Sequence, residues 1–446
     1  MRFWAAKGFL GIGLGVLVLL ASSSFPAALQ KKSLQRIEDF VLFTGDKIPS
    51  LIGSQTRDLH LFACHSSSPQ AIPFQIDKRD SDGRYIFPNE KNRDPLRDGT
   101  RLDQNDEMVF MAKDAGDPCP EPIPVAAAAK GVELALTDSL NGRKAWVYLL
   151  ETPGAPAPAT ADYVHYRIES GREMIATEQY EIGQVLGVTY YDYLRLRRPD
   201  GGWSPDLLDR TKVGMKARLL NGAIPIHVPE GEIRAVILGV IDGPVRVIRD
   251  ELDLVRIKAI GLEWSTEYYI THYFNGHVSP VEINVPFSLR KAFLEISFYW
   301  AMDFNESISG SVFRNPSNPK GILLDGQPDS KVEREKDNPY LVIEGPQGAD
   351  LEIILLDQAL SQMLIRTTYV RENLSRSDPP EDHPGQILAG VWFKNSDRLV
   401  RGTYHYWFYH YYPYPFSEGK VQEILNLIER PIQVFARPLS SAPAAP

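Results

Sequence analysis

Residues 211–219, with the sequence TKVGMKARL, carry the pattern that decides the fold. Charged and apolar side chains alternate along the stretch, and the apolar set is Val213, Met215, Ala217 and Leu219. A period of two predicts a strand with one face in a core and the other toward solvent. Similar alternation recurs at 163–168, 188–197, 245–257, 264–274 and 281–287. Half-buried strands favour antiparallel sheets, so we expect a mainly β protein.

Turn and helix signals complete this picture. Asn141-Gly142 separates two apolar runs, 132–137 and 145–151, and predicts a tight hairpin, because both turn positions of such a hairpin need positive φ. One amphipathic helix is expected at 420–430, where apolar residues recur at helical spacing before Pro431. A second, shorter helix is a candidate at 357–364.

The length of 446 residues suggests two or three domains. The segment TPGAPAPATA at 152–161 has the composition of an extended linker, so we place a domain boundary there. We therefore expect a β domain with acidic loops at 33–152, a Pro/Ala linker at 153–161, a β-sandwich domain at 162–437 and a disordered tail at 438–446. The net charge of -9 argues against a protein that binds nucleic acid, because such domains usually carry a basic face.

Residues 1–24 are predicted to be an export signal. Arg2 and Lys7 precede an apolar run at 8–21, which is shorter than the ~20 residues that a membrane-spanning helix needs and suits the core of a signal peptide. Cleavage near Ser24 would leave a periplasmic or extracellular protein without an integral membrane span. An uncleaved anchor is the alternative.

Cys64 and Cys119 are the only two cysteines. In an oxidising compartment such a pair is more often bonded than free, so we expect a disulfide between them. The alternative is two unrelated buried thiols. Two cysteines are too few for a thiolate zinc centre.

The segment 72–117 is unusually rich in carboxylates. Two clusters stand out, and their oxygen-bearing residues are Asp77, Asp80, Asp82, Asp103, Asn105, Asp106 and Glu107. Because calcium takes six to eight hard oxygen ligands, these residues predict a calcium site in strand-flanked loops. An EF-hand is not supported, since Lys78 stands where that loop needs an acid. The alternative is that the acids form turns and pair with neighbouring Lys and Arg side chains.

Residues 404–416, YHYWFYHYYPYPF, are almost all aromatic or histidine. Aromatic rings with polar tips suit sugar binding, so the candidate ligand-binding residues are Tyr404, Tyr406, Trp407 and Tyr409. The alternative is a central strand buried on both faces. His405 and His410 would face opposite sides of such a strand, and no histidine pair has zinc-ligand spacing.

Several segments carry a resemblance. The wording IPFQID at 72–77, the Asp-rich turn at 80–83, and LDQNDE at 102–107 with FMA at 110–112 resemble a group of largely uncharacterised exported bacterial proteins. The segment IDGPVRVIR at 241–249 is similar to a stretch of that group. The opening at 43–53 is similar to the small β-barrel that begins some polysaccharide-active proteins, in which a galactose-mutarotase-like super-sandwich follows. This resemblance implies a small barrel-like first domain and a larger antiparallel β-sandwich with one C-terminal helix; as an analogy of fold, it assigns no catalytic residue.

Three functional classes follow from these observations. The leading hypothesis is an exported, carbohydrate-binding protein of the periplasm or cell exterior, whose partner is a polysaccharide or cell-envelope glycan. The alternatives are a polysaccharide lyase or glycoside hydrolase, and a structural envelope protein. No nucleotide-binding loop, serine-hydrolase elbow or haem motif is present in the sequence.

Overall fold

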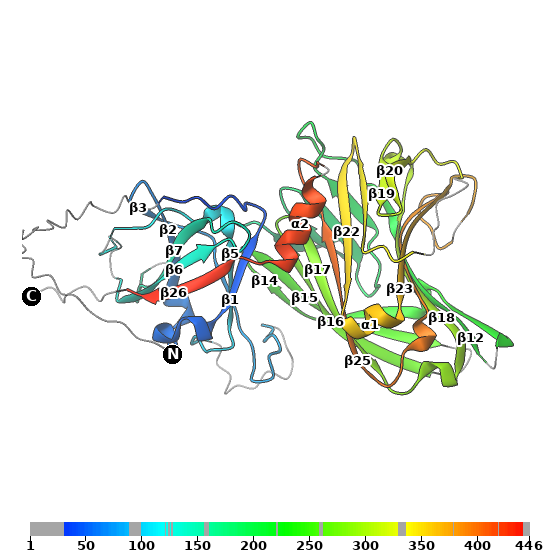
Figure 1. Ribbon diagram of the computed structural model, residues 1–446, viewed down its shortest axis with the longest axis horizontal. Coiled ribbons are helices and arrows are strands. Elements are labelled where there is room, and N and C mark those ends of the chain that lie inside the picture. The colour runs from blue at the N-terminus through cyan, green and yellow to red at the C-terminus, as the bar shows by residue number, and fades with distance from the viewer. Residues whose placement is uncertain are drawn as a thin grey trace, which may run out of the picture.

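The computed structural model describes residues 31–439, apart from 89–99, 121, 124, 126–127, 156–159, 220–221, 258–261, 329–335, 378 and 418. The predicted signal peptide, the tail beyond Leu439 and part of the predicted linker lie outside the described residues. Two β-rich lobes stand side by side in Figure 1, with the N-terminal lobe on the left. Every strand pair in the described chain is antiparallel, and the mainly β prediction is confirmed.

The first domain consists of two sheets around one core. The smaller sheet has the order β1 (Phe40–Thr44), β5 (Glu107–Met111) and β4 (Gln75–Asp77). The larger has the order β26 (Gln433–Pro438), β6 (Lys130–Thr137), β7 (Lys144–Glu151), β2 (Leu59–His65) and β3 (Ser68–Ala71). Alternate apolar residues of both sheets, such as Phe43, Leu61 and Phe110, share this core. A hairpin joins β6 to β7 as predicted, but six residues separate the strands, and only Gly142 of the Asn141-Gly142 pair has positive φ, at 71°.

The second domain is built on a nine-stranded sheet. Its order is β14 (Ile233–Asp242), β15 (Arg246–Ile257), β16 (Leu262–Tyr273), β17 (Gly276–Val285), β25 (Gly402–Tyr411), β22 (Gly348–Leu356), β21 (Tyr340–Gly345), β19 (Val312–Asn315) and β20 (Asn318–Leu323). The aromatic strand β25 therefore lies in the middle of the sheet, between β17 and β22.

Two smaller sheets complete the second domain. One has the order β13 (Ile224–Val228), β12 (Leu208–Leu219), β18 (Phe293–Phe304), β24 (Gln386–Lys394) and β23 (Ile365–Asn373). The other has the order β11 (Tyr193–Leu196), β10 (Tyr180–Val185), β9 (Arg172–Ala176) and β8 (His165–Glu169). Residues of all three sheets, including Val247, Ile182 and Met302, pack into one core. The TKVGMKARL stretch lies in β12, where Met215 and Ala217 are buried and Lys216 is exposed.

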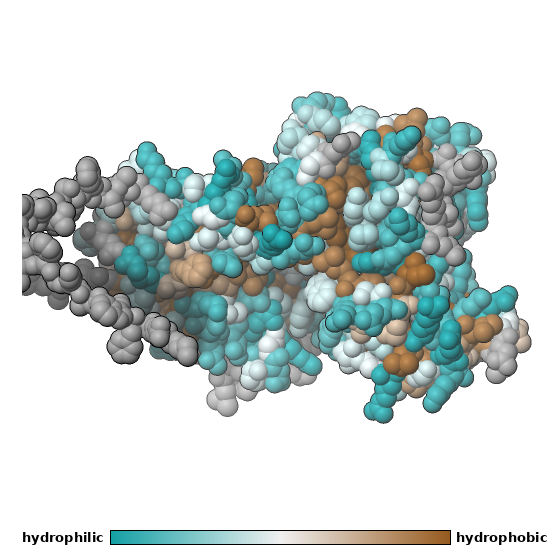
Figure 2. All heavy atoms as spheres, viewed as in Figure 1, coloured by the Kyte–Doolittle hydropathy of each residue, from teal (hydrophilic) through white to brown (hydrophobic). Residues whose placement is uncertain are grey.

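Both predicted helices are present. The C-terminal helix α2 (Gly419–Glu429) packs its apolar face, with Ile424 buried, against the outer side of β22 and β25. Figure 2 shows hydrophobic residues gathered beside α2, on a face that is otherwise mostly hydrophilic. The shorter helix α1 (Gln358–Met363) begins after Asp357, whose carboxylate accepts a hydrogen bond from the Leu360 backbone N–H at 2.7 Å.

After α2 the chain returns to the first domain. Strand β26 pairs with β6 from Gln433 opposite Thr137 to Pro438 opposite Val132, which Figure 1 shows as the red strand in the left lobe. The range 162–437 expected for the second domain therefore includes a strand of the first, and the expected tail begins inside that strand. Local sequence patterns cannot reveal this pairing, because its partners are about 300 residues apart.

Candidate functional site

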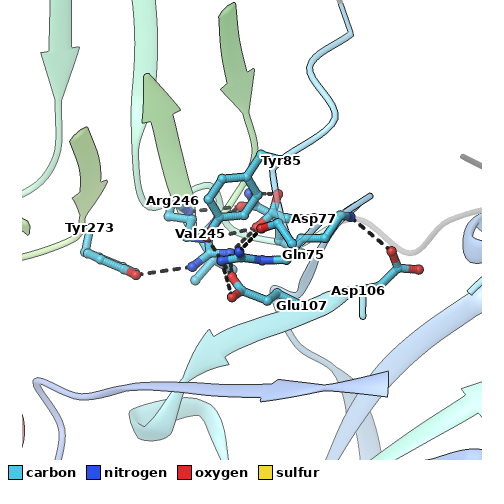
Figure 3. Close-up of polar contacts among 10 residues, drawn as sticks. Gln75, Asp77, Tyr85, Asp106, Glu107, Val245, Arg246 and Tyr273 are labelled. Carbon is cyan, nitrogen blue, oxygen red and sulfur yellow. Dashed lines mark hydrogen bonds and ion pairs between the residues drawn. The ribbon is translucent and has the colours of Figure 1, made fainter. Parts of the chain in front are cut away.

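A buried arginine joins the two domains. Arg246, the first residue of β15, is only 1% exposed, and its Nη2 lies 2.6 Å from the Asp77 carboxylate and 2.7 Å from the Glu107 carboxylate. Asp77 ends β4 and Glu107 begins β5, so both acids come from the first domain. Figure 3 shows the guanidinium between them. Two carboxylates converge on one charge that is removed from water, an arrangement that stabilises only while all partners remain.

Backbone contacts fix the same junction. The Gln75 side-chain oxygen accepts hydrogen bonds from the backbone N–H of Val245 at 3.2 Å and of Arg246 at 3.0 Å. Gly243 passes so close that a Cβ there would lie 2.3 Å from the Gln75 side chain. The motifs at 72–77, 102–107 and 241–249 therefore meet in space, and what they build is a contact between the domains.

Glu107 has further partners. It forms an ion pair with Arg79, and the Tyr85 hydroxyl donates a hydrogen bond to it at 2.7 Å. Burial alone would raise the pKa of Glu107, but the Arg246 and Arg79 charges outweigh it and hold that pKa below its ordinary value. The acid is therefore an ionised member of the junction.

The other predicted calcium ligands lie in neighbouring turns. Asp106 is fully buried, forms an ion pair with Lys78 and accepts the Asp103 backbone N–H at 2.8 Å. The Asp103 carboxylate accepts hydrogen bonds from the backbone N–H groups of Asn105 and Asp106. The Asp80 carboxylate accepts hydrogen bonds from the backbone N–H groups of Asp82 and Arg84. Asn105 donates to the Asp80 carbonyl at 3.4 Å, and Asp82 is exposed. The positive charge beside these acids thus comes from Lys and Arg side chains, the arrangement that the sequence left open as the alternative to calcium.

The aromatic strand β25 lies largely within packed layers. Tyr404 is buried in a core cluster and its hydroxyl donates to the Val400 carbonyl at 3.0 Å, so no face of its ring is left for a surface ligand. Tyr406 contacts the Phe393 ring, and Tyr409 packs against the hydrophobic cluster that includes the apolar face of α2. Trp407 is half-buried beside the exposed His405. Among the four predicted ligand-binding residues, Trp407 remains the candidate for an outward-facing ring.

The inner face of the nine-stranded sheet carries a row of ionisable residues whose proximity the sequence did not predict. His272 of β16 pairs with His277 of β17, which pairs with His410 of β25, which pairs with Glu352 of β22. The His277 and His410 rings stack with centroids 4.5 Å apart and planes 9° apart. Asn275-Gly276 marks a turn in the sequence, but the turn in the structure is Phe274-Asn275, and this shift by one residue is what places His272 opposite His277.

Three members of this region form a compact triad. Asp350, Glu352 and His410 are each at most 1% exposed, and one potential ligand atom from each lies within 4.8 Å of the others. Burial raises the pKa of Asp350 to about 8 and lowers that of His410 to about 3, because the charged form of either group loses its hydration. The triad could hold a metal ion.

A second aromatic group lies on the outer face of the five-stranded sheet of the second domain. Tyr299 of β18 pairs with Trp392 of β24, and their ring centroids are 5.2 Å apart. The Lys216 amine lies 4.9 Å from the Trp392 ring centroid, and the Arg371 guanidinium 5.8 Å from it. Gly214 makes room for the Tyr299 ring, since a Cβ there would approach its hydroxyl to 2.5 Å. This surface combines half-buried rings with exposed cations.

Cys64 of β2 and Cys119 are bonded, with Cα atoms 5.4 Å apart. The bond ties the segment after β5 to the five-stranded sheet of the first domain. No known protein family and no curated protein matches the chain. Within the described residues, no helix has the length and apolar character needed to cross a membrane.

Proposed function

We propose that the protein is an exported carbohydrate-binding protein that holds an acidic glycan on the outer face of the five-stranded sheet of the second domain. The observation that carries this proposal is the pair of rings of Tyr299 and Trp392 flanked by Lys216 and Arg371. The apolar face of a sugar stacks on such rings, and hydrogen-bonding groups at their edges meet its hydroxyls.

Charge favours an acidic sugar over a neutral one. The chain has a net charge of -9, yet Lys216 and Arg371 both lie near the Trp392 ring, on the strands β12 and β23 that border β18 and β24. The exposed His227 is 3.2 Å from the Tyr299 hydroxyl. A uronate stacked on Trp392 would bring its carboxylate to Lys216 and Arg371. His227 is a neutral hydrogen-bonding group there, because burial and the Lys216 charge lower its pKa. Because Lys216 is exposed and flexible, its amine can leave the ring and pair with the ligand.

Two further observations bear on the proposal. The disulfide is compatible with an oxidising compartment and so with export to the periplasm or cell exterior. Glycan binding at this surface does not require a calcium ion in the first domain. Arg246, Arg79 and Lys78 supply positive charge to the acids there.

The test is calorimetric titration of the purified mature chain with polygalacturonate, alginate and a neutral glucan. We expect binding to at least one polyuronate, at least about 10-fold weaker binding after Trp392→Ala because a stacked ring is lost, and weakening by added salt because the Lys216 contribution is screened. Shortening of the polymer in the same samples would assign the lyase or hydrolase class instead of a simple binder.

The matched control is Trp407→Ala, which removes a half-buried tryptophan from the other sheet. Circular dichroism establishes that each variant is folded. Binding lost in the Trp407 variant and kept in the Trp392 variant would move the site to β25. A wild-type chain that binds none of the polyuronates would refute the proposal.

A further inference from the structure

We infer that Asp350, Glu352 and His410 bind a divalent transition-metal ion of the zinc type inside the second domain. The inference is independent of the proposed glycan surface, which lies on another sheet. It rests on three features of the triad: its strand geometry, its unpartnered polar atoms and the chemistry of its ligand set.

The strands aim all three side chains at one place. Glu352 of β22 lies directly opposite His410 of β25, so both side chains project from the same face of the sheet. Asp350 is two residues before Glu352 on β22 and therefore shares that face. The Asp350 Oδ1 lies 3.9 Å from the His410 Nδ1. Ligand atoms within 4.8 Å of one another need only small side-chain rotations to surround an ion at bond lengths of about 2.0–2.2 Å.

The polar atoms of the triad are unpartnered within the part of the chain that the structure describes. All four carboxylate oxygens of Asp350 and Glu352, and both ring nitrogens of His410, lack a hydrogen-bond partner among the residues that the structure describes. Buried polar groups are nearly always satisfied, and an unsatisfied group in a native protein points to a bound ion or water. Six such atoms in one place, all removed from solvent, favour a bound ion over a single water.

The ligand set selects the class of metal. Calcium takes six to eight oxygen ligands, whereas this site offers two carboxylates and one imidazole. Zinc and its first-row neighbours accept mixed nitrogen and oxygen ligands and four-coordinate geometry. Three protein ligands leave one position for a water molecule or a substrate atom. The parallel ring of His277, stacked on His410, holds the imidazole in place.

A surface pocket lies next to the triad along the chain. It has a volume of about 320 Å³, and its lining includes Gly348 and Ala349, just before Asp350, and Pro413 and Tyr414, just after Tyr412. The Tyr412 hydroxyl, just beyond the end of β25, is buried and has no hydrogen-bond partner in the described part of the chain. The pocket and the triad are therefore neighbours in sequence at the Gly348 end of β22.

The experiment begins with the full mature chain, purified without chelator and analysed by plasma mass spectrometry. We expect about one zinc or related ion per chain. The protein is then stripped with a chelator and titrated with Zn²⁺ and Co²⁺, and we expect visible Co²⁺ absorption bands and a metal-dependent rise of several degrees in the melting temperature. Glu352→Gln and His410→Gln should each weaken Co²⁺ binding at least 100-fold and abolish the melting shift.

The matched control is His405→Gln. His405 lies on the same strand and also faces two acids, Glu282 at 3.3 Å and Asp357 at 3.8 Å, but it is exposed. This variant should bind metal like the wild type. If a triad variant does not fold, X-ray absorption of the wild-type Co²⁺ form replaces it, with one imidazole and oxygen ligands as the expected shell.

Three results would overturn the inference. They are a wild-type chain that takes up no metal either during expression or after titration, a folded His410→Gln variant with unchanged Co²⁺ affinity and spectrum, and an absorption shell without imidazole. In any of these cases the carboxyls of Asp350 and Glu352 would be neutral buried acids. The glycan titration would be unaffected, so failure here is distinguishable from failure of the proposed function.

Discussion

The Arg246 guanidinium lies 2.6 Å from the Asp77 carboxylate, although the two residues belong to different domains and are 169 positions apart. Glu107, also from the first domain, approaches the same nitrogen to 2.7 Å. The acid-rich segment of the first domain therefore binds one arginine of the second domain. The stability of this junction depends on keeping the buried charges paired.

Arg246→Met should destabilise the protein strongly. The substitution removes the charge between Asp77 and Glu107 and leaves two buried carboxylates to repel each other, which typically costs about 3–5 kcal/mol. Urea unfolding at pH 7 measures the loss. The control is Arg167→Met, since Arg167 forms an exposed pair with Glu169 and such pairs contribute at most about 1 kcal/mol. Equal effects of the two substitutions would show that the junction contributes no special stability.

Gly243→Ala should disturb the same junction through space alone. The new Cβ would lie 2.3 Å from the Gln75 side chain, which cannot move away without losing its hydrogen bonds to Val245 and Arg246. Overpacking of this kind typically costs about 1–3 kcal/mol. Gly231→Ala is the matched control, because a Cβ at Gly231 meets nothing within 4 Å. The two urea midpoints should differ clearly; coincident midpoints would contradict the close packing described here.

Asp253→Asn should change how stability depends on pH. Burial, reinforced by the nearby Glu251 charge, raises the pKa of Asp253 to about 8, against about 3.9 for an unfolded aspartate. The folded state therefore holds a proton that the unfolded state releases, and this contribution is complete below about pH 4 and is lost as the pH rises through about 8. The variant lacks this loss, so its stability should improve relative to wild type between pH 5 and pH 8.5. Urea midpoints measured across that range would contradict the prediction if the two curves ran parallel.

Much of the fold is readable from local pattern. The alternation around Met215 and Ala217 predicted β12, and Asn141-Gly142 predicted the β6–β7 hairpin, because side-chain period and turn chemistry act over a few residues. The helix α2 was predicted by its apolar spacing for the same reason. The return of β26 to the first domain was not predicted, since pairing over 300 residues leaves no local signal.

The candidate sites were harder to read, because their partners come from distant strands. The spacing of Asp77 and Glu107 gave no sign that Arg246 would lie between them, so oxygen-rich loops favoured calcium as an interpretation. Glu352 and His410 are 58 positions apart and meet only through the register of β22 and β25. Asn275-Gly276 indicated a turn between His272 and His277, but a two-residue hairpin at that dipeptide would have placed His272 opposite Ser279. The observed pairing of the two histidines depends on a turn at Phe274-Asn275.

Removal of β26 should weaken the first domain, although the deletion lies at the other end of the chain. A chain that stops after Arg430 loses strand pairing with β6 and exposes the core surface that Ile432 covers. Full burial of one such side chain stabilises by about 1.5–3 kcal/mol, so we expect a loss of at least about 2 kcal/mol and faster proteolysis within residues 31–151. A chain that stops after Leu439 keeps β26 and is the control. If both truncated chains unfold at the same urea concentration, the pairing of β26 with β6 does not stabilise the first domain.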